Sequence, residues 1–334
     1  MDKHEIRICL ESEYDKLISF LKEHWKSDHI FVKSKEMLDF QHLDKATQQY
    51  NFIIALNPQT QEFDAVLGFI PLNFFDNNLT HNEFWLAIWK VKDSSKKSGI
   101  GLKVLLYFFN TFKPNFIAAI GISEDAKRIY KAFKYKLGNL EHFYIKNPLY
   151  KDFQIAHFEN DKRAQNKLQT PYSFKAINPK DLTIKGVFHP LKSKDFLENR
   201  YAKHPFYTYK IYGIFEKELL KSAFVFRKLE VNGHCCLRIV DWLGDFIPNL
   251  YACFVSLLLE FEAEYIDFLC YVENQNALLN MGFTLKAKGE IIPNYFEPYL
   301  KENINLEFAY KSKVSPCVIF KGDSDQDRPN FIKE

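Results

Sequence analysis

The stretch KDSSKKSGIGLKVLLYFFNTF, residues 92–112, decides the fold that the sequence predicts. A polar loop with two glycines runs directly into an apolar segment, which we expect to be a helix over residues 102–112. Gly99 and Gly101 allow the backbone to turn tightly, so that N–H groups at the start of the helix can point at a diphosphate. A loop that only caps a helix has the same pattern, so the flanking segments must decide between a phosphate-binding loop and a simple helix cap. Three lysines add positive charge beside the loop: Lys96, Lys97 and Lys103.

The segments on either side of this loop predict a mixed α/β domain. Apolar residues at helical spacing indicate a helix over residues 14–26. Alternating and apolar runs predict an antiparallel hairpin from residues 51–58 and 63–72, and further strands at 83–91 and 115–123. A serine and two acidic residues then open a helix that we expect to run from Ser123 to Gly138. The predicted fold class is α/β, with a mixed, mostly antiparallel sheet flanked by helices.

The same order of elements recurs in the second half of the chain. Residues 151–180 are polar with weak periodicity and are predicted to be a linker between domains 1–150 and 181–334. After it we expect strands at 219–231, 234–244 and 265–272, helices opened by Pro248 and by Glu273, and a last strand near residues 290–293. No glycine loop precedes the helix after Pro248, so the second domain is not expected to bind a coenzyme.

The glycine loop resembles the acetyl-CoA motif of the GNAT (GCN5-related N-acetyltransferase) superfamily, written Gln/Arg-x-x-Gly-x-Gly/Ala. Lys96 stands in the first place of the motif, which departs from the pattern but still supplies a donor for phosphate. The following helix resembles the GNAT helix with an Ala-x-x-x-Tyr pattern, here Ala126 and Tyr130. The resemblance implies acetyl-CoA or another acyl-CoA as co-substrate, and Tyr130 as the acid that protonates the departing thiolate. The coenzyme-binding residues that it implies are Lys96, Lys97, Ser98, Gly99, Ile100, Gly101 and Leu102.

Further candidate residues have a structural interpretation of equal or greater weight. Glu83 and His142 are candidate proton acceptors for the attacking amine, and each is also typical of an ordinary strand residue. His24, Trp25 and His29 lie where GNAT proteins shape the acceptor pocket, although Trp25 also fits the apolar face of its helix. In the second half, the helix with Asn274, Ala277, Gly282 and Phe283 also resembles a GNAT helix. Candidate acceptor-binding residues there are His204, Tyr207, Asp241 and Glu273.

Composition limits the classes of function. Basic and acidic residues number 45 and 42, for a net charge of +3, so no nucleic-acid partner is expected. The six cysteines lie in apolar runs without metal spacing, which predicts buried free thiols, and we expect no metal. The acidic C-terminal stretch fits a solvated or docked turn better than a calcium loop, because Arg328 stands where that loop needs glycine. No apolar run reaches about 18 residues, so we expect no membrane span and a cytoplasmic protein.

Taken together, the resemblance implies an acyl-CoA-dependent acyltransferase, an N-acetyltransferase of a tandem form similar to sugar acyltransferases of bacterial surface-polysaccharide pathways. The implied acceptor is an amino sugar, free or nucleotide-linked, and transfer would be direct, with both substrates bound together. Two alternatives stay open at this point: a peptidoglycan-type aminoacyltransferase that uses aminoacyl-tRNA, and a GNAT pair that binds a sugar or partner without turnover. The sequence gives no prediction of oligomeric state.

Overall fold

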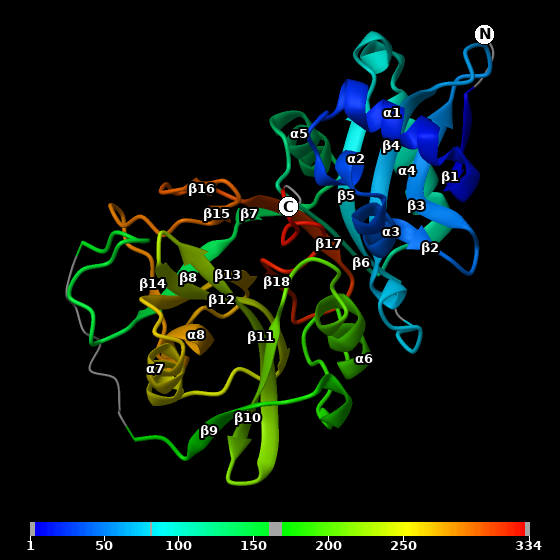
Figure 1. Ribbon diagram of the computed structural model, residues 1–334. Helices are drawn as coiled ribbons and strands as arrows, with labels where there is room; N and C mark the ends of the chain where they lie inside the picture. The colour runs from blue at the N-terminus through cyan, green and yellow to red at the C-terminus, as the bar shows by residue number, and fades with distance from the viewer. Residues whose placement is uncertain (1–3, 81, 160–168, 331–334) are drawn as a thin grey trace.

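The chain folds into two mostly antiparallel sheets flanked by helices, as the computed structural model of residues 4–80, 82–159 and 169–330 shows (Figure 1). The first half of the chain builds most of one sheet, and the second half builds most of the other. The last described residues of the chain, up to residue 330, lie between the two halves (Figure 1). The predicted α/β fold class with two sheets in tandem is therefore confirmed.

The first sheet has the strand order β1-β3-β4-β5-β6-β17-β7, with β2 paired to β3. All pairs of neighbouring strands in this sheet are antiparallel except β5 and β6, which run parallel. The strands are β1 (Glu5–Leu10), β2 (Leu43–Asp44), β3 (Gln49–Leu56), β4 (Phe63–Pro71), β5 (Glu83–Val91), β6 (Phe116–Ile120), β7 (Lys136–Asn139) and β17 (Glu307–Ser312).

Helices cover both faces of this sheet because each has an apolar stripe at helical spacing. On one face, α1 (Tyr14–His24), α2 (Ile30–Lys33) and α3 (Lys35–His42) bury side chains against β3 and β4. On the other face, α4 (Ile100–Phe112) and α5 (Glu124–Ala132) pack against the same strands and β6. Short turns of helix complete this half: η1 (Glu11–Glu13), η2 (Leu72–Phe74) and η3 (Asp93–Ser98).

The second sheet repeats this plan, with the order β14-β8-β13-β12-β11-β10-β9, and β18 paired to β13. Again one neighbouring pair of that path, β12 and β13, is parallel. The strands are β8 (Glu141–Lys146), β9 (Tyr172–Ala176), β10 (Lys210–Glu216), β11 (Leu219–Val231), β12 (His234–Gly244), β13 (Tyr265–Val272), β14 (Thr284–Leu285) and β18 (Val318–Phe320), with a separate hairpin of β15 (Tyr295–Phe296) and β16 (Tyr299–Leu300). The helices are α6 (Lys194–Leu197), α7 (Tyr251–Glu260) and α8 (Asn276–Met281), with turns η4 (Pro179–Asp181) and η5 (Glu198–Ala202).

Each half of the chain contributes one strand to the sheet of the other half. Strand β8 follows β7 directly in sequence but pairs with β13 in the second sheet. Strand β17, from the second half, lies between β6 and β7 in the first sheet. The domain boundaries 1–150, 151–180 and 181–334 thus stay a prediction. The exchanged strands join the two halves by hydrogen bonds, which connect them more closely than a linker alone would.

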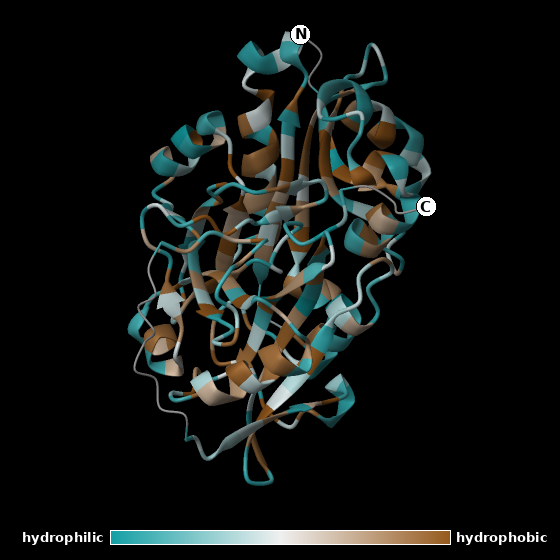
Figure 2. Cartoon of the chain, turned by 60° about the vertical axis from the view of Figure 1, so that its left-hand side comes forward, coloured by the Kyte–Doolittle hydropathy of each residue, from teal (hydrophilic) through white to brown (hydrophobic). Residues whose placement is uncertain are grey.

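The core continues from one sheet to the other. Side chains of β5 and β6, such as Trp85 and Phe116, form one buried cluster with Val225 and Leu243 of the second sheet. Figure 2 shows brown along the strands in the interior and teal over much of the loops. All six cysteines are buried and unpaired, as predicted. Within the described residues, no helix is both long enough and apolar enough to cross a membrane.

Four local predictions differ from the structure. The helix that opens at Ser123 ends at Ala132, because Lys134 takes the left-handed conformation (φ 60°), and Gly138 lies in β7. Helix α7 begins at Tyr251, after Pro248. Near residues 290–293 the structure has an isolated bridge between His157 and Ile291 and no strand. Part of the expected linker, Tyr172–Ala176, is strand β9, which pairs with β10.

Candidate functional site

The parallel strands β5 and β6 diverge part of the way along their length. Their pairing begins at Glu83 and Phe116 and ends at Leu86 and Ala119, whereas β5 continues to Val91. A bulge in the pairing of β4 and β5 falls at the same level. The backbone of residues 87–91 therefore has no partner on β6, and we call this opening the β5–β6 gap.

The second sheet has an equivalent opening, the β12–β13 gap, which the chain itself fills. The pairing of β12 with β13 ends at Ile239 and Phe268, and β18 then pairs with the free end of β13. The following residues join both strands, because Lys321 N–H donates to Leu269 O (3.0 Å) and Gly322 N–H to Val240 O (2.9 Å). A backbone strand already occupies the position that a ligand could take.

Gly322 gives a test of how tightly this gap is filled. A Cβ atom at residue 322 would meet Val240 O at 2.6 Å and the Tyr201 hydroxyl, so we expect Gly322→Ala to lower the free energy of unfolding by about 1–3 kcal/mol. Gly233→Ala is the control. The space around residue 233 is open, so that substitution costs only the backbone strain of a positive φ (82°). Urea unfolding of both variants measures the difference; a smaller loss for Gly322→Ala than for Gly233→Ala would contradict tight packing.

Beyond the β12–β13 gap, the C-terminal segment, residues 321–330, reaches the β5–β6 gap. Ser324 Oγ donates to Leu86 O (3.4 Å), and Gln326 Nε2 donates to Ile120 O (3.1 Å). The aspartates of this segment, Asp323, Asp325 and Asp327, are 2–6% exposed. The sequence predicts either a solvated or a docked turn for the acidic C-terminal stretch, and the burial of its aspartates confirms the docked turn.

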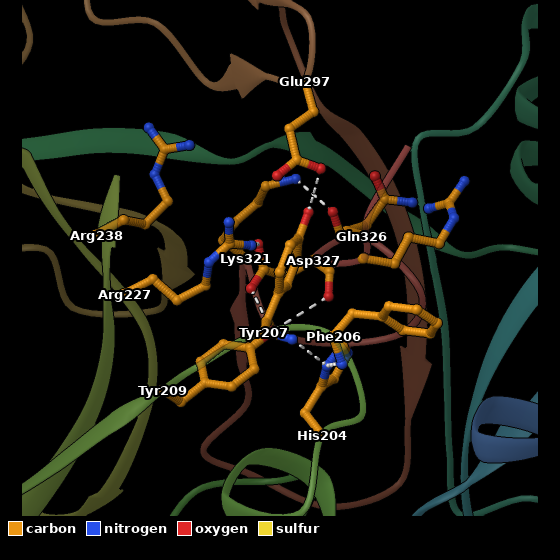
Figure 3. A network of polar contacts seen from close by, with 12 residues as sticks. His204, Phe206, Tyr207, Tyr209, Arg227, Arg238, Glu297, Lys321, Gln326 and Asp327 are labelled. Atoms are coloured by element: carbon orange, nitrogen blue, oxygen red, sulfur yellow. Dashed lines mark hydrogen bonds and ion pairs between the residues drawn. The ribbon is translucent and has the colours of Figure 1, made fainter. Parts of the chain in front are cut away.

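A polar cavity of about 230 Å³ opens at the β5–β6 gap, between the two halves. Ala87 and Ile88 of β5 and Ile120 and Gly121 after β6 form one wall, and the C-terminal segment forms another. Figure 3 shows charged side chains of the second half of the chain converging here. The charged residues in its lining are Arg227, Arg238, Glu297, Lys321, Asp325, Asp327 and Arg328.

Arg227 is held in place by an aromatic ring and a carboxylate. Its guanidinium lies 3.3 Å from the centre of the Tyr207 ring, and its NH1 donates to Asp327 Oδ1 at 3.0 Å (Figure 3). Burial opposes the charge of Asp327, but Arg227 and Lys321 keep the pKa of Asp327 below its usual value. Tyr207 in turn donates its hydroxyl to Glu297 (2.8 Å).

Arg238 is the centre of a second buried network. Its Nε and NH2 donate to the two oxygens of Asp267 at 2.9 and 2.6 Å, and its NH2 also reaches Pro293 O. His142 Nε2 lies 2.9 Å from the same carboxylate. Burial opposes the charge of Asp267, but Arg238 keeps its pKa low, and burial lowers the pKa of His142. The network therefore contains a carboxylate, a guanidinium and a neutral imidazole at neutral pH.

The glycine loop lies at the N-terminus of α4, as predicted, and there Ser98 Oγ accepts the N–H of Ile100 (3.3 Å). Gly99 adopts φ 72° and has open space beside it. At Gly101 a Cβ atom would meet Val91 Cγ2 at 2.7 Å, so a larger residue would displace the Val91 side chain. The indole Nε1 of Trp89 lies 3.7 Å from that position, and it is buried with no partner among the described residues. Lys96 pairs with Asp93 (2.8 Å) at the surface.

Tyr130, the predicted acid, lies on α5 on the same face of the sheet as the loop. Its ring is 2% exposed and packs against Trp89 (5.9 Å) and Tyr135 (4.9 Å). Burial raises the pKa of its hydroxyl, which therefore keeps its proton at neutral pH. A retained proton is what a general acid needs, although the same packing is typical of a core aromatic residue.

The two predicted bases lie outside the cavity lining. Glu83 is 1% exposed and binds His189 Nδ1 (2.5 Å) and Leu191 N (2.6 Å), so that it attaches a loop of the second half to β5. His142 is buried on β8 and belongs to the Arg238 network. Glu83 thus connects the two halves, and His142 supports the strands of the second sheet.

Among the predicted acceptor-site residues of the first half, Trp25 lines the cavity and is 46% exposed. His29 lies behind the lining, with its Nε2 2.7 Å from Arg328 NH2. Burial and the charge of Arg328 lower the pKa of His29 to about 3, so its ring is neutral. His24 packs its ring against Phe20 on α1 and is absent from the lining.

In the second half, Tyr207 is the predicted residue that lines the cavity. His204 supports it, because His204 Nδ1 accepts the N–H of Tyr207 (2.9 Å). Asp241 is fully buried and binds Lys192 and Tyr201, and Glu273 lies on an exposed bend. The structure therefore brings together Trp25 and Tyr207 from the predicted set.

The site residues predicted from the sequence include none of the charged residues of the lining. Arg227 and Arg238 stand inside apolar strands, where a charged residue is almost never buried without a partner, and this signal could have marked them. Lys321, Gln326 and Arg328 lie in a stretch that resembles a solvated tail, and nothing local distinguishes them. Among the residues that the structure describes, no three His, Cys, Asp or Glu side chains gather as metal ligands.

No protein-family model matches the chain, and no curated protein matches its sequence. Among solved structures, the chain is similar to a GCN5-related N-acetyltransferase from Anabaena variabilis, with a TM-score of 0.56 and 10% identity over 92% of this chain and 72% of that one. It is also similar to a protein from Pyrococcus horikoshii provisionally named an acetyltransferase, with a TM-score of 0.48 and 11% identity over 94% and 91% of the two chains. At such identities the first likeness shows the fold, which confirms the expected GNAT architecture.

Proposed function

We propose that this chain is an acyl-CoA-dependent acyltransferase, an N-acetyltransferase that modifies an amine held in the cavity between its two halves. One observation carries the proposal: in a GNAT fold, the β5–β6 gap opens on a polar cavity and has a glycine loop at a helix N-terminus nearby. The β12–β13 gap is filled by β18, so the proposed donor site lies in the first half.

In this proposal the chain's own residues bind and polarise the donor. Residues 96–102 hold the diphosphate, since N–H groups at the start of α4 and the lysines of the loop favour negative charge. Bound acyl-CoA supplies a thioester. The backbone of Ala87 or Ile88, which β6 leaves unpaired, polarises the acyl carbonyl, and Tyr130 gives a proton to the leaving sulfur.

The proposed acceptor is an amino sugar, free or nucleotide-linked, in surface-glycan biosynthesis. The exposed ring of Trp25 and the polar side chains of the cavity support this choice, because sugars bind to aromatic faces and hydrogen-bonding groups together. Glu297 is the carboxylate that we assign to accept the proton of the amine, since it lines the cavity and its side chain binds the Tyr207 hydroxyl. Transfer is direct, with both substrates bound at once.

The test is release of free CoA from acetyl-CoA in the presence of a panel of free and nucleotide-linked amino sugars. We expect thiol release that depends on one class of amine, together with an acetylated product of the matching mass. The N-acetylated form of the same sugar is the control, because its nitrogen is no longer nucleophilic. Binding of acetyl-CoA without transfer to any amine would contradict the proposal and favour a non-catalytic binding protein.

A further inference from the structure

The cations around the cavity differ in whether a carboxylate balances them. Three arginines each have an aspartate partner, so their charges are compensated inside the protein. The pairs are Arg227 with Asp327 (3.0 Å), Arg238 with Asp267 (2.6 Å) and Arg328 with Asp325 (3.5 Å).

Lys321 is the exception in this set. The residue is 5% exposed and lines the cavity. Its Nζ donates to the carbonyl oxygen of Gln326 at 2.6 Å (Figure 3), and among the described residues no carboxylate lies within ion-pair distance of it. Burying an ammonium group is costly unless an anion compensates it, and here the protein supplies a neutral oxygen in that place.

Two further polar atoms of the lining have no partner within the described part of the chain. Asn294 is 6% exposed, and its Oδ1 is a buried acceptor without a donor. Arg328 Nε is a buried donor without an acceptor. Buried polar groups in native proteins are nearly always hydrogen-bonded, so these two residues of the lining each keep one polar atom without a partner.

We propose that the acyl acceptor carries an anionic group, a carboxylate or a phosphate, and that Lys321 binds this anion in the cavity. This inference rests on the proposed function in taking the ligand of the cavity to be the acyl acceptor. The Lys321 ammonium and Arg328 Nε donate to the anion, while Asn294 Oδ1 accepts from a hydroxyl or amine of the same molecule.

The electrostatics of Lys321 agree with this role. Burial is the main cause that lowers its pKa, to about 8; the charge of Asp327 opposes this change, and the charges of Arg238, Arg328 and Arg227 add to it. The ring of Tyr295 lies 5.9 Å from Nζ. An anion at Nζ would favour the charged form, so binding would raise the pKa of Lys321. Affinity for the anion would then fall as the pH rises through the pKa of the free protein.

The experiment is a pH titration of the Lys321 side chain by NMR in protein labelled with ¹³C at lysine, without acyl-CoA, so that it stays separate from the acyl-transfer test. The signal is assigned by its loss in Lys321→Met or Lys321→Arg. The probes are inorganic phosphate and acetate. We expect a pKa near 8 without ligand and a rise of about one unit or more with at least one probe.

Phosphate alone shifting the pKa assigns a phosphorylated acceptor, and acetate alone assigns a carboxylated one. Lys228 of β11, which follows Arg227 in the sequence, is the matched control. The Lys228 side chain pairs with Glu230. A shift at Lys321 with little change at Lys228 supports the proposal. No shift with either anion, or equal shifts at both lysines, would overturn it, even if acyl transfer to an uncharged amine were observed.

Discussion

Replacing Asp267 by asparagine is expected to lower the free energy of unfolding by about 3–5 kcal/mol. The side chain keeps its size, but Arg238 loses the charge that balances its buried guanidinium, and both are nearly inaccessible to water (3% and 0% exposed). His142, which shares the carboxylate, is left with a neutral amide as its partner. Urea unfolding followed by circular dichroism measures the change.

Asp93→Asn is the matched control for this prediction. Asp93 pairs with Lys96 at 2.8 Å, close to the contact length in the buried pair, but its side chain is 77% exposed. Water already compensates both charges there, so the stability should change little. If the two substitutions had similar effects, the Arg238–Asp267 pair would not be the buried support of the cavity that the structure describes.

Replacing Tyr130 by phenylalanine is expected to reduce turnover by about 10²–10⁴-fold, the usual contribution of a general acid. The affinity for acetyl-CoA should change little, because the ring stays packed against Trp89 and Tyr135 and only a hydroxyl is removed. Steady-state kinetics with the acceptor found by thiol release, alongside calorimetry with acetyl-CoA, separates the two effects.

Tyr135→Phe is the control, since its ring lies 4.9 Å from Tyr130 and its hydroxyl is also buried. That substitution removes the same group from the same cluster and should leave turnover close to that of the unchanged protein. Unchanged turnover in Tyr130→Phe, or equal losses in both variants, would remove Tyr130 from the chemistry and leave it a core residue.

The elements that the sequence predicts well are those with strong local patterns. The glycine loop and α4 lie where the glycines followed by an apolar run predict them. Strands β3, β4 and β5 likewise follow their alternating or apolar runs. The exchange of β8 and β17 could not be predicted, because each is a short strand that fits either sheet and only long-range pairing chooses between them.

The acceptor cavity was harder to predict than the donor loop for a similar reason. A diphosphate loop is a local feature, whereas the cavity combines residues from β11, β12 and the last ten described positions of the chain. Lys321 and Gln326 acquire their positions only after β18 fills the β12–β13 gap and directs the segment to the β5–β6 gap. Their residue types alone are typical of a solvated tail.

The most direct test of the account is calorimetric titration with acetyl-CoA of the unchanged protein and of two tryptophan variants, Gly99→Trp and Gly233→Trp. Both glycines have positive φ (72° and 82°) and open space around them, so the two substitutions impose similar backbone strain. The account predicts that the unchanged protein and Gly233→Trp bind acetyl-CoA, and that Gly99→Trp loses about tenfold or more in affinity because the side chain blocks the loop. Absence of binding by the unchanged protein, or equal binding by all three, would contradict a donor site at the start of α4.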